Sequence, residues 1–229
     1  MSAVRLAAVP QQSYPVPATG DDSGFEQIFD GATLTGWEGD PKYWRVENGA
    51  LVGEITPDTL LKQNSFIIWR GGVTRDFELK VQFRISLQGN SGINYRSIEV
   101  AGQPWAMKGY QADLDGQNRY TGNLYEERGR TFMALRGQVT RATAGSKREV
   151  IASVGELKDL EALTKQQDWN DFHLIVRGNV LIHILNGRVM CELIDDDVNE
   201  RRMEGLLGVQ VHVGPPMKVE YRNVRLKRL

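Results

Sequence analysis

The chain has 229 residues, of which 41% are hydrophobic and 25% charged, a composition typical of a globular chain with a sizeable core. Its 28 basic and 29 acidic residues leave a formal net charge of -1, so no overall positive field favours nucleic acid or an anionic membrane as a partner. The single cysteine, Cys191, excludes an intrachain disulfide and a zinc site built on several cysteines.

Residues 1–24 are predicted to be a flexible lead-in that precedes a single folded domain of residues 25–229. Pro10, Pro15 and Pro17 are followed by a Gly-Asp-Asp-Ser-Gly run, which is typical of surface segments. The lead-in lacks the continuous apolar stretch of a signal peptide. The chain also has no run of eighteen apolar residues, so no membrane-spanning helix is predicted.

The domain begins as a series of short runs in which apolar and polar residues alternate, which is typical of an all-β chain. Asn48-Gly49 and Asn186-Gly187 each stand between two apolar runs and predict tight hairpins. Residues 77–86 alternate strictly, with aromatic and aliphatic residues at the odd positions. They predict a strand with one buried and one solvated face.

Few segments depart from this pattern. The spacing in 155–163 is the only one that favours a short helix, and a change of parity within 219–229 predicts a bulge near Arg222-Asn223. Residues 128–168 are expected to be the least regular insertion. Roughly a dozen strands without a βαβ rhythm predict an all-β fold, an antiparallel β-sandwich of the concanavalin or lectin-like jelly-roll type with one short helix.

Three separated strands carry an unusual set of polar residues on one face. Aspartate is depleted from strands, yet residues 109–116 place two aspartates and a glutamine at alternate positions. Residues 90–96 and 208–214 repeat the pattern with amides, a guanidinium and an imidazole. The predicted polar face consists of Gln111, Asp113 and Asp115, of Asn90, Asn94 and Arg96, and of Gln210 and His212.

Two interpretations of this face remain open. The residues are either the solvent face of a sandwich or a shared concave surface that binds a hydroxyl-rich ligand through many donors and acceptors. Trp105, in the loop before residue 109, is a candidate platform for stacking a sugar ring. No cofactor is required by any motif, although a divalent cation held by Asp113 or Asp115 together with His212 stays open. His212 is alternatively a structural histidine.

The motifs FEQIFDGATLTGWEG, YWRVENGALVG, GNSGINYRS, GYQADLDG, YTGNLYEERGR and GVQVHVGPPMKVEYRNVRLKRL occur in an order that resembles the 3-keto-disaccharide hydrolase family over nearly all of 25–229. The resemblance implies a concanavalin-like sandwich and cleavage of glycosides that carry a ketone at C3. It also implies a bacterial protein exported to the periplasm or the outside of the cell, by a signal not visible here. Many family members carry Glu and Gln at the positions of Gln111 and Asp113. In this chain the carboxylate therefore lies one strand period, roughly 6 to 7 Å, further along.

Such a ketone acidifies the hydrogen on C2, so the implied site needs a base near C2, donors near the C3 oxygen and an acid near the leaving oxygen. The base is predicted to be Asp113, with His212 as its competitor, and Arg96 or a metal ion is predicted to stabilise the enolate. Glu126 or Tyr125 is predicted to protonate the leaving group.

The remaining polar residues of the face are predicted to bind the hydroxyls of an oligosaccharide or glycoside: Gln111, Asp115, Asn90, Asn94 and Gln210. The alternative function is a lectin-like module that binds carbohydrate without cleaving it. The sequence leaves the sugar, the linkage and the oligomeric state open.

Overall fold

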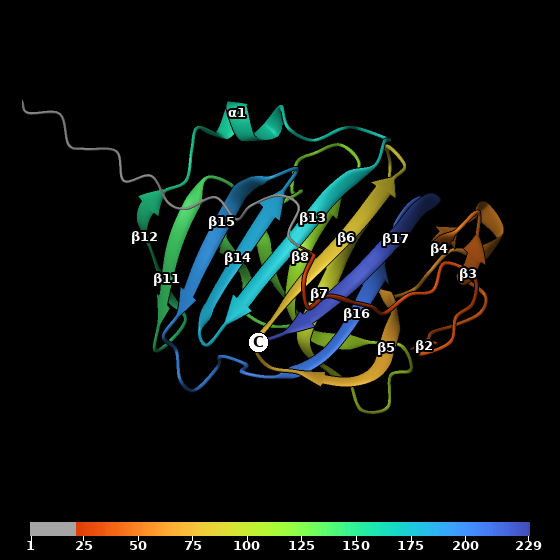
Figure 1. Cartoon of the computed structure of the whole chain (residues 1–229), viewed down its shortest axis with the longest axis horizontal. Coiled ribbons are helices and arrows are strands. Elements are labelled where there is room, and N and C mark those ends of the chain that lie inside the picture. The colour runs from red at the N-terminus through yellow and green to blue at the C-terminus, as the bar shows by residue number, and fades with distance from the viewer. Residues whose placement is uncertain (1–21) are drawn as a thin grey trace, which may run out of the picture.

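The computed structural model describes residues 22–229, so all but the last three residues of the predicted lead-in lie outside the described part of the chain. Two sheets pack face to face in an antiparallel β-sandwich, as predicted (Figure 1). The large sheet has ten strands in the order β12-β11-β15-β14-β13-β6-β17-β4-β3, with β1 paired to β17. The small sheet has seven, in the order β10-β9-β8-β7-β16-β5-β2.

The strands of the large sheet are β1 Glu26–Gln27, β3 Trp44–Glu47, β4 Ala50–Ile55, β6 Phe77–Ile85, β11 Gln138–Thr143, β12 Lys147–Ser153, β13 Asn170–Arg177, β14 Val180–Leu185, β15 Arg188–Asp195 and β17 Met217–Arg228. Those of the small sheet are β2 Trp37–Glu38, β5 Ser65–Thr74, β7 Asn90–Glu99, β8 Met107–Asp115, β9 Leu124–Glu127, β10 Thr131–Ala134 and β16 Gly205–Val211. The helices are the 3₁₀ helix η1 Pro57–Thr59 and the short α1 Leu157–Glu161.

The core lies between the sheets and is built by the alternation seen in the sequence. Along β6, the odd-numbered side chains from Phe77 to Ile85 are buried and the even-numbered ones are half-buried on the outer face. Val209 and Val211 of β16 project into the same core from the small sheet. Because successive side chains of a strand point to opposite faces, the polar residues of β16 are turned to the outside of the small sheet.

The predicted turns are confirmed. Asn48-Gly49 joins β3 to β4 and Asn186-Gly187 joins β14 to β15, and all four residues have the positive φ that a type I′ turn requires. The register of β17 against β6 shifts between Arg222 and Arg225, and this shift is the expected bulge. Within residues 22–229, no helix combines the length and the apolar character needed to cross a bilayer.

Residues 128–168 are more regular than expected. They supply β10 to the small sheet, β11 and β12 to the large sheet, and α1. β11 pairs parallel to β15, and β12 forms an edge of the large sheet with every residue exposed. A strand without a buried face carries no apolar alternation, so its sequence does not look like that of a strand.

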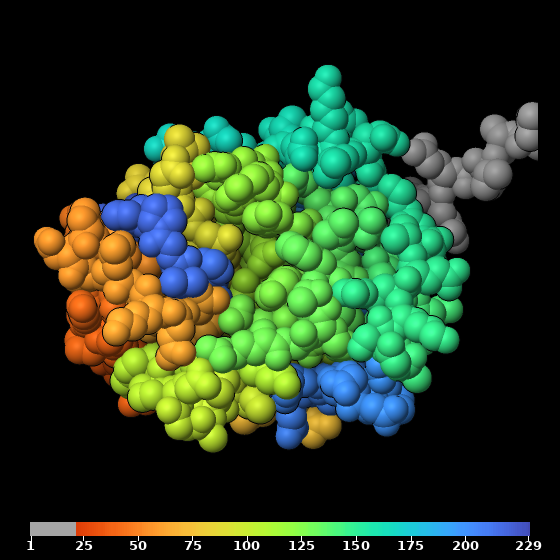
Figure 2. Space-filling model, turned by 180° about the vertical axis from the view of Figure 1, so that it is seen from behind, coloured from red at the N-terminus to blue at the C-terminus, as the bar shows by residue number. Residues whose placement is uncertain are grey.

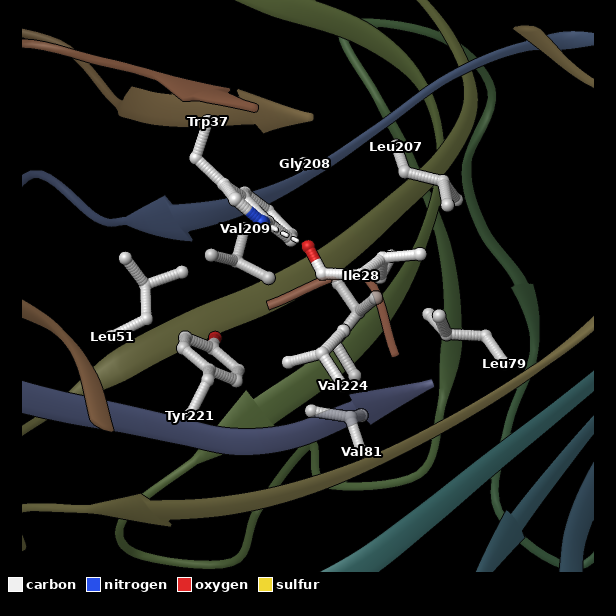
Figure 3. Close-up of a pocket in the computed structure, with 11 residues that line it drawn as sticks. Ile28, Trp37, Leu51, Leu79, Val81, Leu207, Gly208, Val209, Tyr221 and Val224 are labelled. Carbon is white, nitrogen blue, oxygen red and sulfur yellow. Dashed lines mark hydrogen bonds between the residues drawn. The ribbon is translucent and has the colours of Figure 1, made fainter. Parts of the chain in front are cut away.

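A small cavity between the sheets is lined by apolar groups, among them Leu79, Val209 and Val224 (Figure 3). Its volume is about 10 Å³, and above it Trp37 Nε1 donates a hydrogen bond of 2.7 Å to the carbonyl oxygen of Ile28. A cavity of this size and character has neither the room nor the polar partners for a sugar. This cavity is therefore not a sugar site.

Candidate active site

Most of the polar residues predicted on three strands meet on the outer face of the small sheet, because β8, β7 and β16 are neighbours in it. Gly92 lies opposite Asp113, and Asn94 lies opposite both Gln111 and Gly208. Residues directly opposite in an antiparallel pair share a face. Figure 2 shows this side of the molecule hollowed between the blue loop that follows β16 and the green segment around β9 and β10.

An amide–carboxylate cluster, made of Gln111, Asp113, Glu127 and Gln210, lies at the centre of this face. Gln111 Nε2 donates to Asp113 Oδ1 at 2.8 Å, and Gln210 Nε2 donates to Gln111 Oε1 at 3.2 Å and towards Glu127 Oε2 at 3.5 Å. Asn64 Nδ2 donates to Glu127 Oε1 at 3.2 Å from the start of β5. The cluster thus joins three strands, β8, β9 and β16, and through Asn64 the residue before a fourth, β5.

Gly92 makes the arrangement of the cluster sterically feasible. A Cβ atom at this position would lie 2.4 Å from Cγ and Cδ of Gln111, closer than real side chains approach. The Gln111 side chain therefore crosses β7 over a bare backbone, which directs its amide towards Asp113. Gly208 has a similar role beneath Met107, whose sulfur would lie 2.6 Å from an added Cβ atom.

Asp113 is the most perturbed carboxyl group of the face. Burial raises its pKa from an ordinary 3.8 to about 8, and the carboxylates of Glu127 and Asp115 add to that rise. The hydrogen bond from Gln111 lowers the pKa but does not offset the burial. A carboxyl group with a pKa close to neutrality is suited to exchange protons with a ligand.

Unpartnered amide atoms lie beside this carboxyl group. Asn94 is fully buried, and neither its Nδ2 nor its Oδ1 atom has a hydrogen-bond partner. Gln210 Oε1 is buried without a partner as well. Because buried polar atoms in native proteins are almost always hydrogen-bonded, these atoms have capacity for the donors and acceptors of a bound molecule.

At one end of the face, fewer polar groups are available to a ligand than the sequence predicted, because the Asp115 carboxylate is hydrogen-bonded to the turn that follows β8. Its carboxylate accepts hydrogen bonds from the backbone N–H groups of Gln117 at 3.2 Å and Arg119 at 2.8 Å, and from Arg119 Nε at 3.2 Å. Asp115 lies on the predicted face, but these three donors occupy its oxygens, and its binding of substrate stays a prediction. Asn90, half-buried opposite Asp115, lies at the same end of the face.

The expected position of Arg96 on the face is wrong. Arg96 has a positive φ of 44°, and the pairing of β7 with β8 shifts between Tyr95 and Ile98, so strict alternation ends there. Its fully buried guanidinium donates to the carbonyl oxygens of Arg75 at 2.9 Å and Gly178 at 2.6 Å, and to Asp76 Oδ1 at 3.0 Å. Arg96 cross-links loops of the sandwich instead of facing a ligand.

Of the two residues predicted as the acid for the leaving group, Glu126 is the one that points inward. It lies opposite Tyr110 and is held by Arg130, whose Nε is 2.5 Å from Glu126 Oε2. Arg130 also makes two hydrogen bonds to Asp195, at 2.6 and 3.1 Å. This buried network lies on the core side of β9.

The same alternation turns Tyr125 and Glu127 to the outer face. Tyr125 lies opposite Gln111, and its pKa is raised by burial and by the charges of Glu127 and Asp113. Glu127 was missed by the sequence interpretation, although it shares its parity with Tyr125. Asn64 was missed as well, since nothing in the sequence signals that the start of β5 approaches β9.

His212 and Trp105 lie at the margins of the face. His212 follows the last residue of β16, and its Nδ1–H donates to the carbonyl oxygen of Val213 at 2.6 Å. Trp105 is half-buried in the loop before β8, where its carbonyl oxygen accepts from the N–H of Phe66 at 2.9 Å. Neither side chain belongs to the amide–carboxylate cluster.

A metal centre has no support in the described residues. Among residues 22–229, no three His, Cys, Asp or Glu side chains gather closely enough to hold an ion. Asp113, Asp115 and His212, the candidate ligands, have separate surroundings, since Asp115 is bound by the turn and His212 lies beyond the end of β16.

A second, larger hollow of about 500 Å³ lies on the outer face of the large sheet. Its polar lining groups are largely paired with one another. Lys80 and Arg225 both bind Asp22, and Gln82 Nε2 donates to Asp171 Oδ1 at 2.9 Å. The unpartnered amide atoms of the small sheet distinguish the first site from this one.

Comparisons with known proteins identify a family and agree with the β-sandwich fold. The model of a family described as "3-keto-alpha-glucoside-1,2-lyase-like domain" matches residues 24–227. A curated 3-keto-disaccharide hydrolase from Bacteroides thetaiotaomicron is 31% identical over 102 residues, which are 42% of this chain and 34% of that protein. The match therefore spans about a third of the length of that relative.

Solved structures show the same sandwich. One, from Parabacteroides distasonis, is named provisionally as a glycosyl hydrolase; it has a TM-score of 0.59 and 16% identity and covers 90% of this chain and 99% of that chain. A carbohydrate-binding module from Bacillus subtilis has a TM-score of 0.55 and 16% identity, with 84% and 95% covered. At these identities the likeness concerns the fold alone.

Proposed function

Because the chain belongs to the family of 3-keto-alpha-glucoside-1,2-lyase-like domains, we propose that it cleaves glycosides whose sugar ring carries a ketone at C3. The observation that carries the proposal is the juxtaposition of Asp113, a buried carboxyl group with a pKa of about 8, and the unpartnered amide atoms of Asn94 and Gln210. An elimination next to a ketone requires a base and a neutral donor, which Asp113 and Asn94 Nδ2 provide, and the free amide oxygens accept from the hydroxyls of the sugar.

In the proposed reaction, the Asp113 carboxylate removes the proton from C2, and the electron pair of that C–H bond forms an enolate with the C3 carbonyl. The enolate then collapses to a C1–C2 double bond and restores the ketone, while the C1–O bond breaks and the leaving oxygen takes a proton. Water adds to C1 of the resulting enone and C2 regains a proton, so the sum is hydrolysis. Two carboxylates at a fixed separation around an oxocarbenium ion are not needed.

The remaining roles follow from the geometry of the face. Asn94 Nδ2, which has no partner, replaces Arg96 as the donor to the enolate oxygen, since the guanidinium is committed elsewhere. The unpartnered Gln210 Oε1 accepts from a hydroxyl group of the substrate. Tyr125 or Glu127, both turned to the outer face, replaces Glu126 as the acid for the leaving oxygen. Neutral donors fixed in a water-poor site stabilise a developing oxyanion without reorganising.

The direct test incubates the protein with a 3-keto-disaccharide and with the unoxidised disaccharide, each with and without a chelator. We expect release of monosaccharide from the oxidised substrate alone, unchanged by the chelator. Turnover of both substrates would contradict the role of the ketone. Loss of turnover with the chelator would show that the reaction requires a metal ion.

Replacing Asn94 tests the donors. We expect Asn94→Leu to lower kcat by roughly 100-fold, the cost of removing one oxyanion donor, without lowering the melting temperature, because it removes two buried atoms that have no partner. Steady-state kinetics measure the fall in kcat, and thermal unfolding measures the melting temperature. A variant that melts much earlier would show that Asn94 is structural.

Sugar binding without cleavage is the second candidate. A protonated Asp113 donates a hydrogen bond as well as accepting one, and its raised pKa keeps the proton in place at neutral pH. This function predicts measurable binding of the disaccharide, oxidised or not, with no product formed over hours.

A further inference from the structure

An aromatic wall, made of Tyr120, Tyr125 and Phe132, borders the amide–carboxylate cluster. The ring centroids of Tyr125 and Phe132 are 5.2 Å apart in an edge-to-face arrangement, and those of Tyr120 and Phe132 are 5.7 Å apart. Tyr120 is 36% exposed and Phe132 is 37% exposed, so both rings present apolar surface to solvent. Isolated exposed rings are common, but a group in which Phe132 contacts both tyrosines beside a polar hollow is not explained by packing.

The wall is continuous with the proposed site. Phe132 lies opposite Tyr125 in the pairing of β10 with β9, and Tyr125 lies opposite Gln111 in the pairing of β9 with β8. The three side chains therefore share one face and follow one another across the sheet. The backbones of β8 and β10 are two strand spacings apart, roughly 10 Å, a distance that two linked six-membered rings span.

The wall is also held in place. The Arg119 guanidinium lies 5.3 Å from the centroid of the Tyr120 ring and is itself bound to Asp115. Arg148 donates to the carbonyl oxygens of Phe132 and Arg130 from the edge strand of the large sheet. A fixed aromatic surface loses little entropy when a ring stacks on it.

We propose that this wall binds the leaving group of the substrate, and that the leaving group is a pyranosyl ring that stacks on Phe132. The inference rests on the proposed function, in which the oxidised ring lies over Asp113 and the bond to C1 points towards Tyr125. A pyranose ring has an apolar face of C–H groups that packs on an aromatic ring and hydroxyls at its edge. A ring placed on Phe132 keeps those hydroxyls within reach of the solvent and of Arg119.

The experiment compares three substrates with different leaving groups: a 3-keto-disaccharide, an aryl 3-keto-glucoside and methyl 3-keto-glucoside. In Phe132→Ala, we expect the ratio of kcat/KM for the disaccharide to that for the methyl glycoside to fall about tenfold. In Phe132→Leu, which retains the apolar bulk, we expect a smaller fall. Val198→Ala, which removes an exposed aliphatic side chain from the loop between β15 and β16, is the matched control and should leave the ratio unchanged.

An unchanged ratio in Phe132→Ala would overturn the inference, and a fall seen with the aryl glycoside alone would overturn the assignment to a pyranosyl ring. If the wild-type protein turns over none of the substrates, the proposed function fails, but the wall is still testable by calorimetry with unoxidised disaccharide and methyl glucoside. Selective loss of disaccharide binding in Phe132→Ala would then support it, and equal binding by the variant and the wild type would overturn it.

Discussion

Asp113→Asn is expected to abolish turnover of a 3-keto-glycoside, with kcat falling at least about a thousandfold, and to stabilise the folded protein at alkaline pH. The first effect follows from the loss of the group proposed to take the C2 proton. The second follows from burial. Asp113 is 7% exposed, and the asparagine keeps the oxygen that accepts from Gln111 but carries no charge.

The sign of the pH dependence is opposite to that of an ordinary salt-bridged aspartate. The folded state holds a proton on Asp113 up to a pH of about 8, whereas the unfolded chain releases it near 3.8. The free energy of unfolding therefore falls as pH rises between these values, by an amount on the order of a few kcal/mol. We expect Asp113→Asn to melt about 5 to 10 °C above the wild type at pH 9, and close to it at pH 4.

Activity should follow the same ionisation. With Asp113 as the base, kcat/KM of the wild type is expected to rise about tenfold for each pH unit below 8 and to level off above it. His212→Ala should lose far less activity than Asp113→Asn and should retain this profile. A flat profile, or an inactive His212→Ala that still folds, would transfer the base to His212.

Asp115→Asn is the matched control for stability, because Asp115 lies on the same strand and the same face. Its carboxylate accepts two backbone N–H groups and the Arg119 guanidinium. The substitution should therefore destabilise the protein by about 1 to 2 kcal/mol and bring no gain at pH 9. An alkaline gain in both variants would mean that the two carboxylates simply repel each other.

Most of what the sequence predicts about the site comes from one rule, that alternate side chains of a strand point to the same face. It placed Gln111, Asp113, Asn94 and Gln210 on one side of their strands without knowledge of the pairing, since alternation is a property of a single extended strand. Their convergence depends on the order of strands in the sheet, and that order is set by long-range packing that no local pattern encodes. The sandwich itself was predictable because its alternation and turn residues are local signals.

The alternation rule failed where the backbone departs from regular strand geometry or where a turn follows the strand. At Arg96 a positive φ and a register shift reverse the side chain, and an arginine gives no local sign of such a bulge, unlike glycine. Asp115 has the right parity, but the turn that follows provides three donors that compete for its oxygens. Glu127 was within reach of the rule, because the step of two that turns Tyr125 outward does the same for it.

Arg130→Met is expected to lower the free energy of unfolding by about 3 to 5 kcal/mol near neutral pH, the largest loss of stability among these variants. Arg130 is buried with two carboxylates, Glu126 and Asp195, and its Nη2 also lies 3.3 Å from Tyr110 Oη. Methionine fills a similar volume but leaves both carboxylates buried without a cation. Because the network anchors β9, the outward pair Tyr125 and Glu127 should lose its position as well.

Chemical denaturation at two pH values separates this explanation from a simple packing defect. In Arg130→Met, protonation of the stranded carboxylates relieves their burial, so the deficit relative to wild type should shrink as pH falls from 7 towards 5. Arg119→Met is the control, since that guanidinium is largely exposed and its ion pair with Asp115 contributes at most about 1 kcal/mol. A deficit in Arg130→Met that is the same at both pH values would assign the loss to packing of the arginine stem, and the buried charges would then have no part in holding β9.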